Sequence, residues 1–152
     1  MIYEITKEGA EVLKKKLESI GEISDEIKQL AQDMKESMIA AKGVGLAGNQ
    51  VGKDLAIFVI DKNLAEKHYV PEVYINPEIT EYSDETDSME EGCLSIPGWW
   101  RSITRSKKVK IKFTDIDGNK IRLRARGFLA RVFQHEFDHL QGMTIRNRSE
   151  NK

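Results

Sequence analysis

The sequence predicts one domain that combines helices with antiparallel strands, and three observations support this prediction. At 152 residues the chain is long enough to bury one hydrophobic core, so we expect a single domain over residues 1–152. Apolar residues recur at helical spacing near residues 24–43 and 127–142. Between these segments, two short runs alternate apolar and basic residues around a turn, which indicates an antiparallel hairpin.

Composition excludes several classes of protein. Hydrophobic residues make up 39% and charged residues 32% of the chain, which is typical of a globular protein in water. The formal net charge of -1 gives no overall basic surface, so we expect no direct reading of nucleic acid. No apolar run reaches membrane-spanning length, and residues 1–5 lack the basic and apolar regions of a signal peptide. With one cysteine and hence no internal disulfide, we expect a cytoplasmic protein without membrane contact.

The first half of the chain contains one clear amphipathic helix. Ser24 is a good N-cap, and two acidic residues follow it in the first turn, where the helix dipole favours negative charge. From Ile27 onwards apolar residues recur at helical spacing until Gly43, which we expect to end the helix. A shorter helix is also predicted over residues 10–20, from apolar side chains at the same spacing.

After the first long helix the apolar period changes to that of strands. Residues 55–60 predict a short apolar strand, and residues 73–76 predict another that we expect Pro77 to close. Residues 108–113 and 120–124 alternate strictly around an Asp-Gly-Asn turn, which predicts a hairpin with one buried and one solvated face. Its basic residues could form a patch, but the solvated outer face of an antiparallel ribbon is the simpler interpretation.

The last predicted element, residues 127–142, is a helix that is apolar over much of its circumference yet carries two histidines, a glutamate and an aspartate. His135 and His139 are four residues apart and therefore share one helix face, where both imidazoles can bind one metal ion. Glu136 would then lie within reach of a water on that metal. Buried ionisable groups are unfavourable unless paired or bound to metal, so a metal site explains this helix better than two surface histidines do.

Few residues could supply a third metal ligand, because the chain has three histidines and one cysteine. Cys93 follows Gly92 in the segment 90–98, and a thiolate with two imidazoles forms a tetrahedral site with one open position, suited to Fe(II) or Zn(II). Two alternatives stay open. One is a buried thiol that acts as a small apolar residue. The other is nucleophilic Cys-His catalysis, in which the spacing of His135 and His139 would be a coincidence.

Residues 43–48 match the G-x-G-x-x-G dinucleotide pattern, but in the reverse context. That fingerprint follows a strand and opens a helix, whereas this segment follows a helix and precedes a strand. We therefore reject nucleotide binding and interpret the glycines as a tight loop whose backbone can approach a ligand closely. Gln50 could project its amide into the same space, although an ordinary loop glutamine is the simpler interpretation.

Three motifs together resemble the signature motifs of peptide deformylase. They occur in order at residues 43–50 (GVGLAGNQ), 91–95 (EGCLS) and 134–140 (QHEFDHL), and the resemblance covers nearly the whole chain. The first motif departs from the family pattern. The family usually has Ala and then Pro or Thr where this chain has Gly48 and Asn49.

The resemblance implies an α+β fold in which antiparallel sheets pack around a central metal-binding helix that carries the HExxH motif. It also implies a hydrolase that removes the formyl group from N-formylmethionyl nascent peptides and releases formate. One divalent metal ion, Fe(II) in the cell with Zn(II), Ni(II) or Co(II) as alternatives, would be bound by Cys93, His135 and His139. Glu136 would act as general base, and the Gln50 amide and the Leu94 backbone N–H would stabilise the oxyanion.

By the same resemblance, substrate would contact five residues, with the first three around the methionine side chain: Val44, Phe128, Val132, Gly45 and Gly92. Asp138 lies off the ligand face, and we expect it to pair with an arginine, Arg105 being the expected partner. Ten residues follow Gly142, and we expect them to lack the C-terminal helix that many bacterial members carry. The ribosome is a candidate partner, and we expect any contact with it to be made without that helix.

Two other functions stay open at this point. A zinc peptidase of the general His-Glu-x-x-His type usually takes its third ligand downstream of the helix, where this chain has no histidine. A diverged deformylase-like protein could bind metal or formyl-peptide without turnover, because Gly48 and Asn49 alter the loop that carries Gln50.

Overall fold

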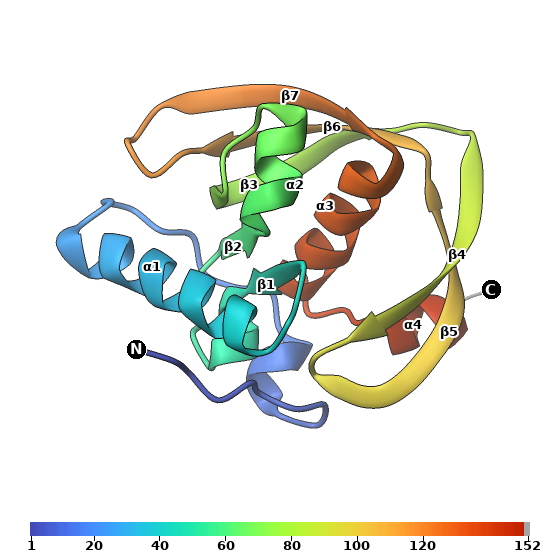
Figure 1. Ribbon diagram of the computed structural model, residues 1–152, viewed down its shortest axis with the longest axis horizontal. Helices are drawn as coiled ribbons and strands as arrows, with labels where there is room; N and C mark the ends of the chain where they lie inside the picture. The colour runs from blue at the N-terminus through green and yellow to red at the C-terminus, as the bar shows by residue number, and fades with distance from the viewer. Residues whose placement is uncertain (151–152) are drawn as a thin grey trace.

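The computed structural model describes residues 1–150 and is built on a five-stranded antiparallel sheet in the order β1-β2-β3-β6-β7, with β4 and β5 forming a separate two-stranded sheet (Figure 1). The strands are β1 (Gly45–Ala47), β2 (Ile57–Ile60), β3 (Val73–Tyr82), β4 (Thr86–Cys93), β5 (Ile96–Ser106), β6 (Lys108–Thr114) and β7 (Lys120–Arg126). The helices are α1 (Asp25–Ala40), α2 (Lys62–His68), α3 (Gly127–Leu140) and α4 (Ile145–Glu150), with short 3-10 helices η1 (Glu11–Lys14) and η2 (Gly48–Val51). The predicted α+β fold is confirmed.

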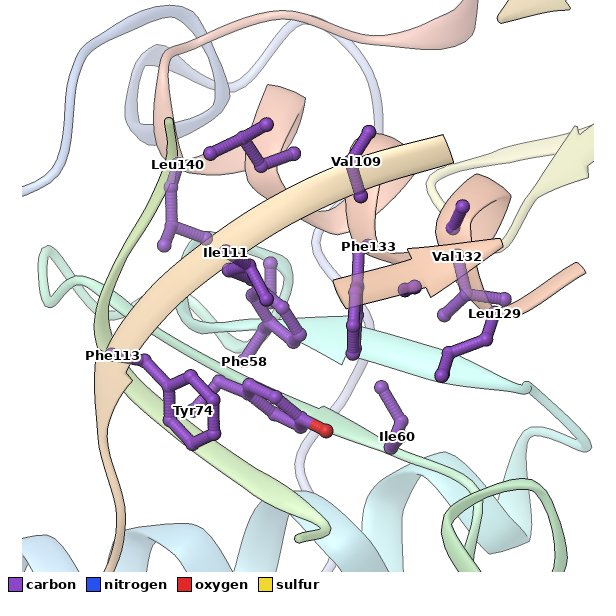
Figure 2. Packing of buried hydrophobic residues seen from close by; sticks show 14 of the residues in the cluster. Phe58, Ile60, Tyr74, Val109, Ile111, Phe113, Leu129, Val132, Phe133 and Leu140 are labelled. Carbon is purple, nitrogen blue, oxygen red and sulfur yellow. The ribbon is translucent and has the colours of Figure 1, made fainter. Parts of the chain in front are cut away.

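Helix α3 packs against one face of the five-stranded sheet and lies between that sheet and the β4–β5 ribbon (Figure 1). Successive strand residues point to opposite faces, so Phe58 and Tyr74 reach the same side of neighbouring strands. Figure 2 shows both rings meeting Phe133 of α3, with 5.0 Å between the ring centroids of Tyr74 and Phe133. Burying each such side chain stabilises the fold by about 1.5–3 kcal/mol, and the packing fixes the depth of α3 in the molecule.

Helix α1 covers the opposite face of the same sheet. Its Met34 and Met38 are fully buried against apolar residues of β1, β2 and β3. The Ser24 hydroxyl accepts a hydrogen bond from the backbone N–H of Ile27, which confirms the predicted N-cap. The burial of Met34 and Met38 identifies both as core residues.

The end of α1 differs slightly from the prediction. The helix stops at Ala40, and Lys42 is the residue with positive φ (59°). Gly43 follows it and donates its backbone N–H to Met38 O at 2.9 Å. A Cβ at position 43 would lie 2.8 Å from Leu94 Cδ1, so a larger residue there would require the Leu94 side chain to shift.

The predicted helix over residues 10–20 is wrong. Only η1 is helical, and the chain then runs extended. Its backbone groups bond to distant elements instead of to each other, with Leu17 N–H donating to Leu140 O at 2.9 Å and Ile20 N–H to Asn76 Oδ1 at 2.8 Å. The apolar side chains are buried, but along an extended segment.

Pro77 does not close β3, contrary to the sequence prediction. The strand continues to Tyr82 through a register shift between Ile75 and Glu78 in its pairing with β6. Proline is tolerated at such bulges because no ladder hydrogen bond is needed there. Asn76 adopts a φ of 50° and is held by hydrogen bonds to the backbone of Ile20.

The β6–β7 hairpin is confirmed, with Lys108 opposite Arg126 at its base. Its outer face is basic, and Lys110 and Lys112 form ion pairs with glutamates of β3. This agrees with the solvated-face interpretation. The sequence analysis did not predict helices α2 and α4, strand β1, the short helix η2 or the two strands of the β4–β5 ribbon. Within residues 1–150, no helix is both long and apolar enough to span a membrane.

Candidate metal centre

The candidate metal ligands come from two parts of the fold that meet beside α3. Cys93 is the last residue of β4 and pairs with Ile96 across the tight turn to β5. His135 and His139 are one turn apart on α3, with ring centroids 5.1 Å apart. One ligand atom from each of the three lies within 4.8 Å of the others, and Cys93 Sγ is 3.3 Å from His139 Nε2.

The chemistry of this donor set fits a divalent metal ion. Burial raises the pKa of the Cys93 thiol, but the charge of His139 and hydrogen bonds with His135 and His139 outweigh burial and lower that pKa to about 5. The thiolate, which is the form that binds metal, is therefore favoured. One thiolate and two imidazoles suit Fe(II) or Zn(II), and these residues form a group able to hold such an ion.

The second ring nitrogen of His135 is held by a carboxylate. His135 Nδ1 lies 3.0 Å from Glu91 Oε1, so a neutral imidazole that donates there leaves Nε2 free for metal. Glu91 is buried and also accepts from Arg105 Nε at 2.7 Å and from Arg131 Nη1. Burial raises the pKa of Glu91, but hydrogen bonds from His135 and Arg105 outweigh it and hold the pKa well below its usual range.

Asp138, also on α3, joins the same charged network. Arg105 Nη1 donates to Asp138 Oδ2 at 2.9 Å, which confirms the predicted pairing. Arg148 of α4 also donates to both oxygens of this carboxylate, at 2.9 and 2.7 Å. Burial raises the pKa of Asp138, but the hydrogen bonds from Arg148 and the charge of Arg105 outweigh it and lower the pKa.

Glu136 is almost fully buried, and its Oε1 has no hydrogen-bond partner in residues 1–150. The carboxylate lies against Gly45, where a Cβ would be 2.6 Å from Glu136 Oε2, so only glycine fits there without a shift. Oε2 is 4.0 Å from His135 Nε2. Burial raises the pKa of Glu136, which brings the carboxyl closer to the range where it can exchange protons near neutral pH.

Gln50 lies in η2 with its amide directed at the cysteine turn. Gln50 Nε2 donates to Ser95 Oγ at 3.2 Å and lies 3.6 Å from Cys93 Sγ, while Oε1 accepts the Ala47 N–H at 3.0 Å. The predicted loop is therefore a short strand, β1, followed by a 3-10 helix that seats Gln50. Leu94 is the residue after Cys93 in the turn, beside this amide.

A cavity of about 590 Å³ is lined by two of the three candidate ligands, Cys93 and His135. All five residues predicted to bind substrate line it: Val44, Gly45, Gly92, Phe128 and Val132. Gln50, Leu94 and Glu136 line the same cavity. Val44 and Phe128 are 46% exposed, which leaves an apolar surface accessible beside the buried carboxyl and the ligands.

Trp100 also lines the cavity and lies over Gly92, where a Cβ would be 2.7 Å from the indole ring. Several other residues around the site were not predicted. Glu91 and Arg131 support His135, Ser95 bonds Gln50, and Arg148 bonds Asp138. The sequence placed Glu91 beside Gly92 and Cys93, but its contact with His135 depends on how the β4–β5 ribbon folds onto α3.

Known proteins resemble the whole chain. The family model described as polypeptide deformylase matches residues 2–152. The chain is 49% identical over 133 residues to peptide deformylase 1 of Clostridium perfringens, covering 88% of each protein. It is 43% identical over 149 residues to the peptide deformylase of Prochlorococcus marinus, covering 98% of this chain and 74% of the relative. The crystal structure of peptide deformylase from Thermotoga maritima superposes with a TM-score of 0.90 at 40% identity, covering 97% of each chain.

Proposed function

The chain belongs to the polypeptide deformylase family, and from this premise we propose that it hydrolyses the N-formyl group of N-formylmethionyl peptides and releases formate. The observation that supports this most is the cavity itself. A buried carboxyl with raised pKa, Glu136, lines it beside the three candidate metal ligands. We propose that residues 1–152 act as one catalytic domain, in the cytoplasm, as the sequence analysis predicts.

Cys93, His135 and His139 would hold one divalent ion, Fe(II) in the cell, although a thiolate and two imidazoles also accept Zn(II), Ni(II) or Co(II). When bound, such an ion lowers the pKa of a water molecule and offsets negative charge on a carbonyl oxygen. The residues that surround the ligands would perform the proton transfer and hold the substrate.

Glu136 would take a proton from the attacking water and return it to the leaving amine. Its Oε1 is buried without a partner among residues 1–150, so no other side chain there competes for that oxygen. The Gln50 amide and the Leu94 backbone N–H would donate to the formyl oxygen as negative charge develops on it. Both residues line the cavity beside Cys93.

The cavity also supports the choice of substrate. Val44, Phe128 and Val132 would enclose the methionine side chain, since they line the cavity from the residue before β1 and from α3. Gly45 and Gly92 would contact the peptide backbone, as the resemblance implies, and both line the cavity. Contact with the ribosome stays a prediction.

The test is an assay of formyl-Met-Ala-Ser hydrolysis by the iron-loaded protein, purified without oxygen. We expect formate release by the wild type and, in Glu136→Ala, a loss of about 10²- to 10⁴-fold with unchanged metal content. Full activity in Glu136→Ala would remove Glu136 from the mechanism. Metal binding by the wild type without formate release would identify a binding protein, and cleavage of an unformylated peptide would identify a peptidase.

Cys93→Ala tests the ligand assignment separately. Because the thiolate is one of three candidate donors, we expect this variant to lose its metal during dialysis against a chelator while the wild type retains it. Metal content is measured by elemental analysis. Full occupancy in Cys93→Ala would return this residue to the class of small buried apolar side chains.

A further inference from the structure

Asn49 links the segment that carries Gln50 to the helix that carries the candidate ligands. It is fully buried in η2. Its side-chain Nδ2 donates to the backbone carbonyl of His139 at 2.7 Å, across 90 residues of sequence, and to the Val12 carbonyl at 3.3 Å. The carbonyl of His139 belongs to the last turn of α3, where it also accepts the Gly142 N–H at 3.1 Å. One amide therefore joins η1, η2 and α3.

Two further polar atoms at this junction have unused hydrogen-bonding capacity. Asn49 Oδ1 and His139 Nδ1 are both buried without a partner in residues 1–150. The Asn49 amide is thus oriented by its donors, both of which point at backbone carbonyls. Replacing the amide by an apolar group of equal shape would remove the donors and leave two carbonyls to rearrange.

Two backbone contacts place η2 against segments other than α3. A Cβ on Gly48 would lie 2.5 Å from Leu55 O, so the backbones of η2 and the segment before β2 are already in close contact. The Gln50 carbonyl accepts the Thr6 N–H at 2.7 Å. The Asn49 side chain, by contrast, contacts α3 through His139, and Asn49 is the residue before Gln50.

We propose that Asn49 is a positioning residue that fixes the position of the Gln50 amide relative to His139. The inference rests on the proposed function, in which Gln50 donates to the oxyanion and His139 binds metal. An oxyanion donor acts only when it lies about 2.7–3.1 Å from the position of the charged oxygen. Loss of the Asn49 hydrogen bonds moves η2 relative to α3 and so displaces the donor from that position.

The test compares Asn49→Leu with Asn76→Leu. Asn76 also holds two backbone groups, both of Ile20 and both below 3 Å, but it lies in β3 outside the cavity. Its φ of 50° makes leucine strained there, so the control variant is destabilised at least as much. We expect Asn49→Leu to lower kcat about 10- to 100-fold with KM within about threefold, because the lost donor acts mainly in the transition state. We expect Asn76→Leu to keep the wild-type kcat well below its melting temperature.

A second measurement reports the ligand geometry around His139 and does not depend on turnover. The visible absorption of the Co(II)-loaded protein depends on ligand geometry, and we expect the bands to shift in Asn49→Leu and to stay in place in Asn76→Leu. Asn49→Asp has the same shape but replaces the donors with acceptors, and we expect a loss of kcat at least as large. If Asn49→Leu does not fold, Asn49→Ala takes its place in both measurements.

An Asn49 variant with the kcat and the Co(II) spectrum of Asn76→Leu would overturn the proposal, while formate release by the wild type would leave the proposed function standing. If the wild type itself releases no formate, the proposed function fails. The Co(II) spectra then decide the remaining part of the inference, the hold of Asn49 on His139.

Discussion

His135 and His139 lie one helical turn apart, yet the groups that hold them differ in charge. His135 Nδ1 contacts Glu91, a buried carboxylate that is also bonded by two arginines. The hydrogen bond to the His139 backbone comes from the neutral Asn49 amide. The side of α3 that faces the β4–β5 ribbon is therefore supported by ions, and the side that faces η1 and η2 by neutral groups.

The two kinds of support differ in how they respond to change. Buried ions stabilise a structure only while each charge keeps its partner, since an unpaired buried charge is strongly unfavourable. A neutral hydrogen bond contributes about 1 kcal/mol and does not titrate. We therefore expect the Glu91 contact of His135 to be sensitive to charge removal and acid, and the Asn49 contact of His139 to be sensitive to neither.

Among the variants that test this difference, Glu91→Ala should have the largest effect on stability. It leaves Arg105 and Arg131 buried without their shared carboxylate and His135 without its hydrogen-bond acceptor. Breaking a buried pair costs about 3–5 kcal/mol, so we expect a loss of that order in the free energy of unfolding in urea. Metal affinity, measured by competition with a chelator, should fall about 10- to 100-fold because the His135 ring is no longer oriented.

Glu90→Ala is the matched control for Glu91→Ala. Glu90 is the preceding residue of β4 and is exposed, so its removal should change the free energy of unfolding by less than about 0.5 kcal/mol. Wild-type stability in Glu91→Ala would mean that the charged network contributes nothing to stability and that His135 is held by packing alone.

The pH dependence of stability is the next largest expected difference. The pKa of Asp138 is lowered in the folded protein, so its charge contributes stability above the unfolded pKa of about 3.9, and this contribution is lost as pH falls through the folded pKa. The shift of Glu91 has the same direction and adds to the effect. We expect Asp138→Asn to be less stable by about 1.5–3 kcal/mol at pH 7, with the gap to the wild type closing as pH falls below about 4.

Asn49→Leu provides the contrast in the same pH series of urea unfolding curves. The Asn49 amide has no titratable group, so its stability gap should stay constant from pH 7 to acid while that of Asp138→Asn narrows. A constant gap for Asp138→Asn would show that its carboxylate is not a source of acid sensitivity, and the contrast between the two sides of α3 would then lose its electrostatic basis.

The parts of the site that the sequence predicts are those governed by local spacing. His135 and His139 share a face because both lie on one helix, and alternation in the β6–β7 hairpin sets its register. Cys93 was found because the chain contains one cysteine and few other soft ligands. These inferences need only the geometry of one element or the scarcity of one residue type.

The supports of the ligands could not be predicted, because they depend on contacts between distant elements. Asn49 and His139 are 90 residues apart, and Glu91 and His135 are 44 apart. The sequence of β4 also did not predict a strand, because most of its residues are exposed, so that apolar and polar residues do not alternate along it. Asp138 and Arg105 were paired by charge alone, but Arg148 joins them only because α4 folds back onto β5.

We expect Arg148→Gln to have the smallest effect. This variant tests whether the charged network depends on α4. Arg148 bonds both oxygens of Asp138, but its side chain is 39% exposed, so solvent and salt screen the pair. Arg105 remains within 2.9 Å of the same carboxylate in this variant. We therefore expect a loss of at most about 1 kcal/mol in the free energy of unfolding, smaller still in high salt, with unchanged metal affinity. A loss as large as that of Glu91→Ala would mean that the charged network depends on α4 as much as on Glu91. The charged support of α3 would then not be confined to the residues around His135.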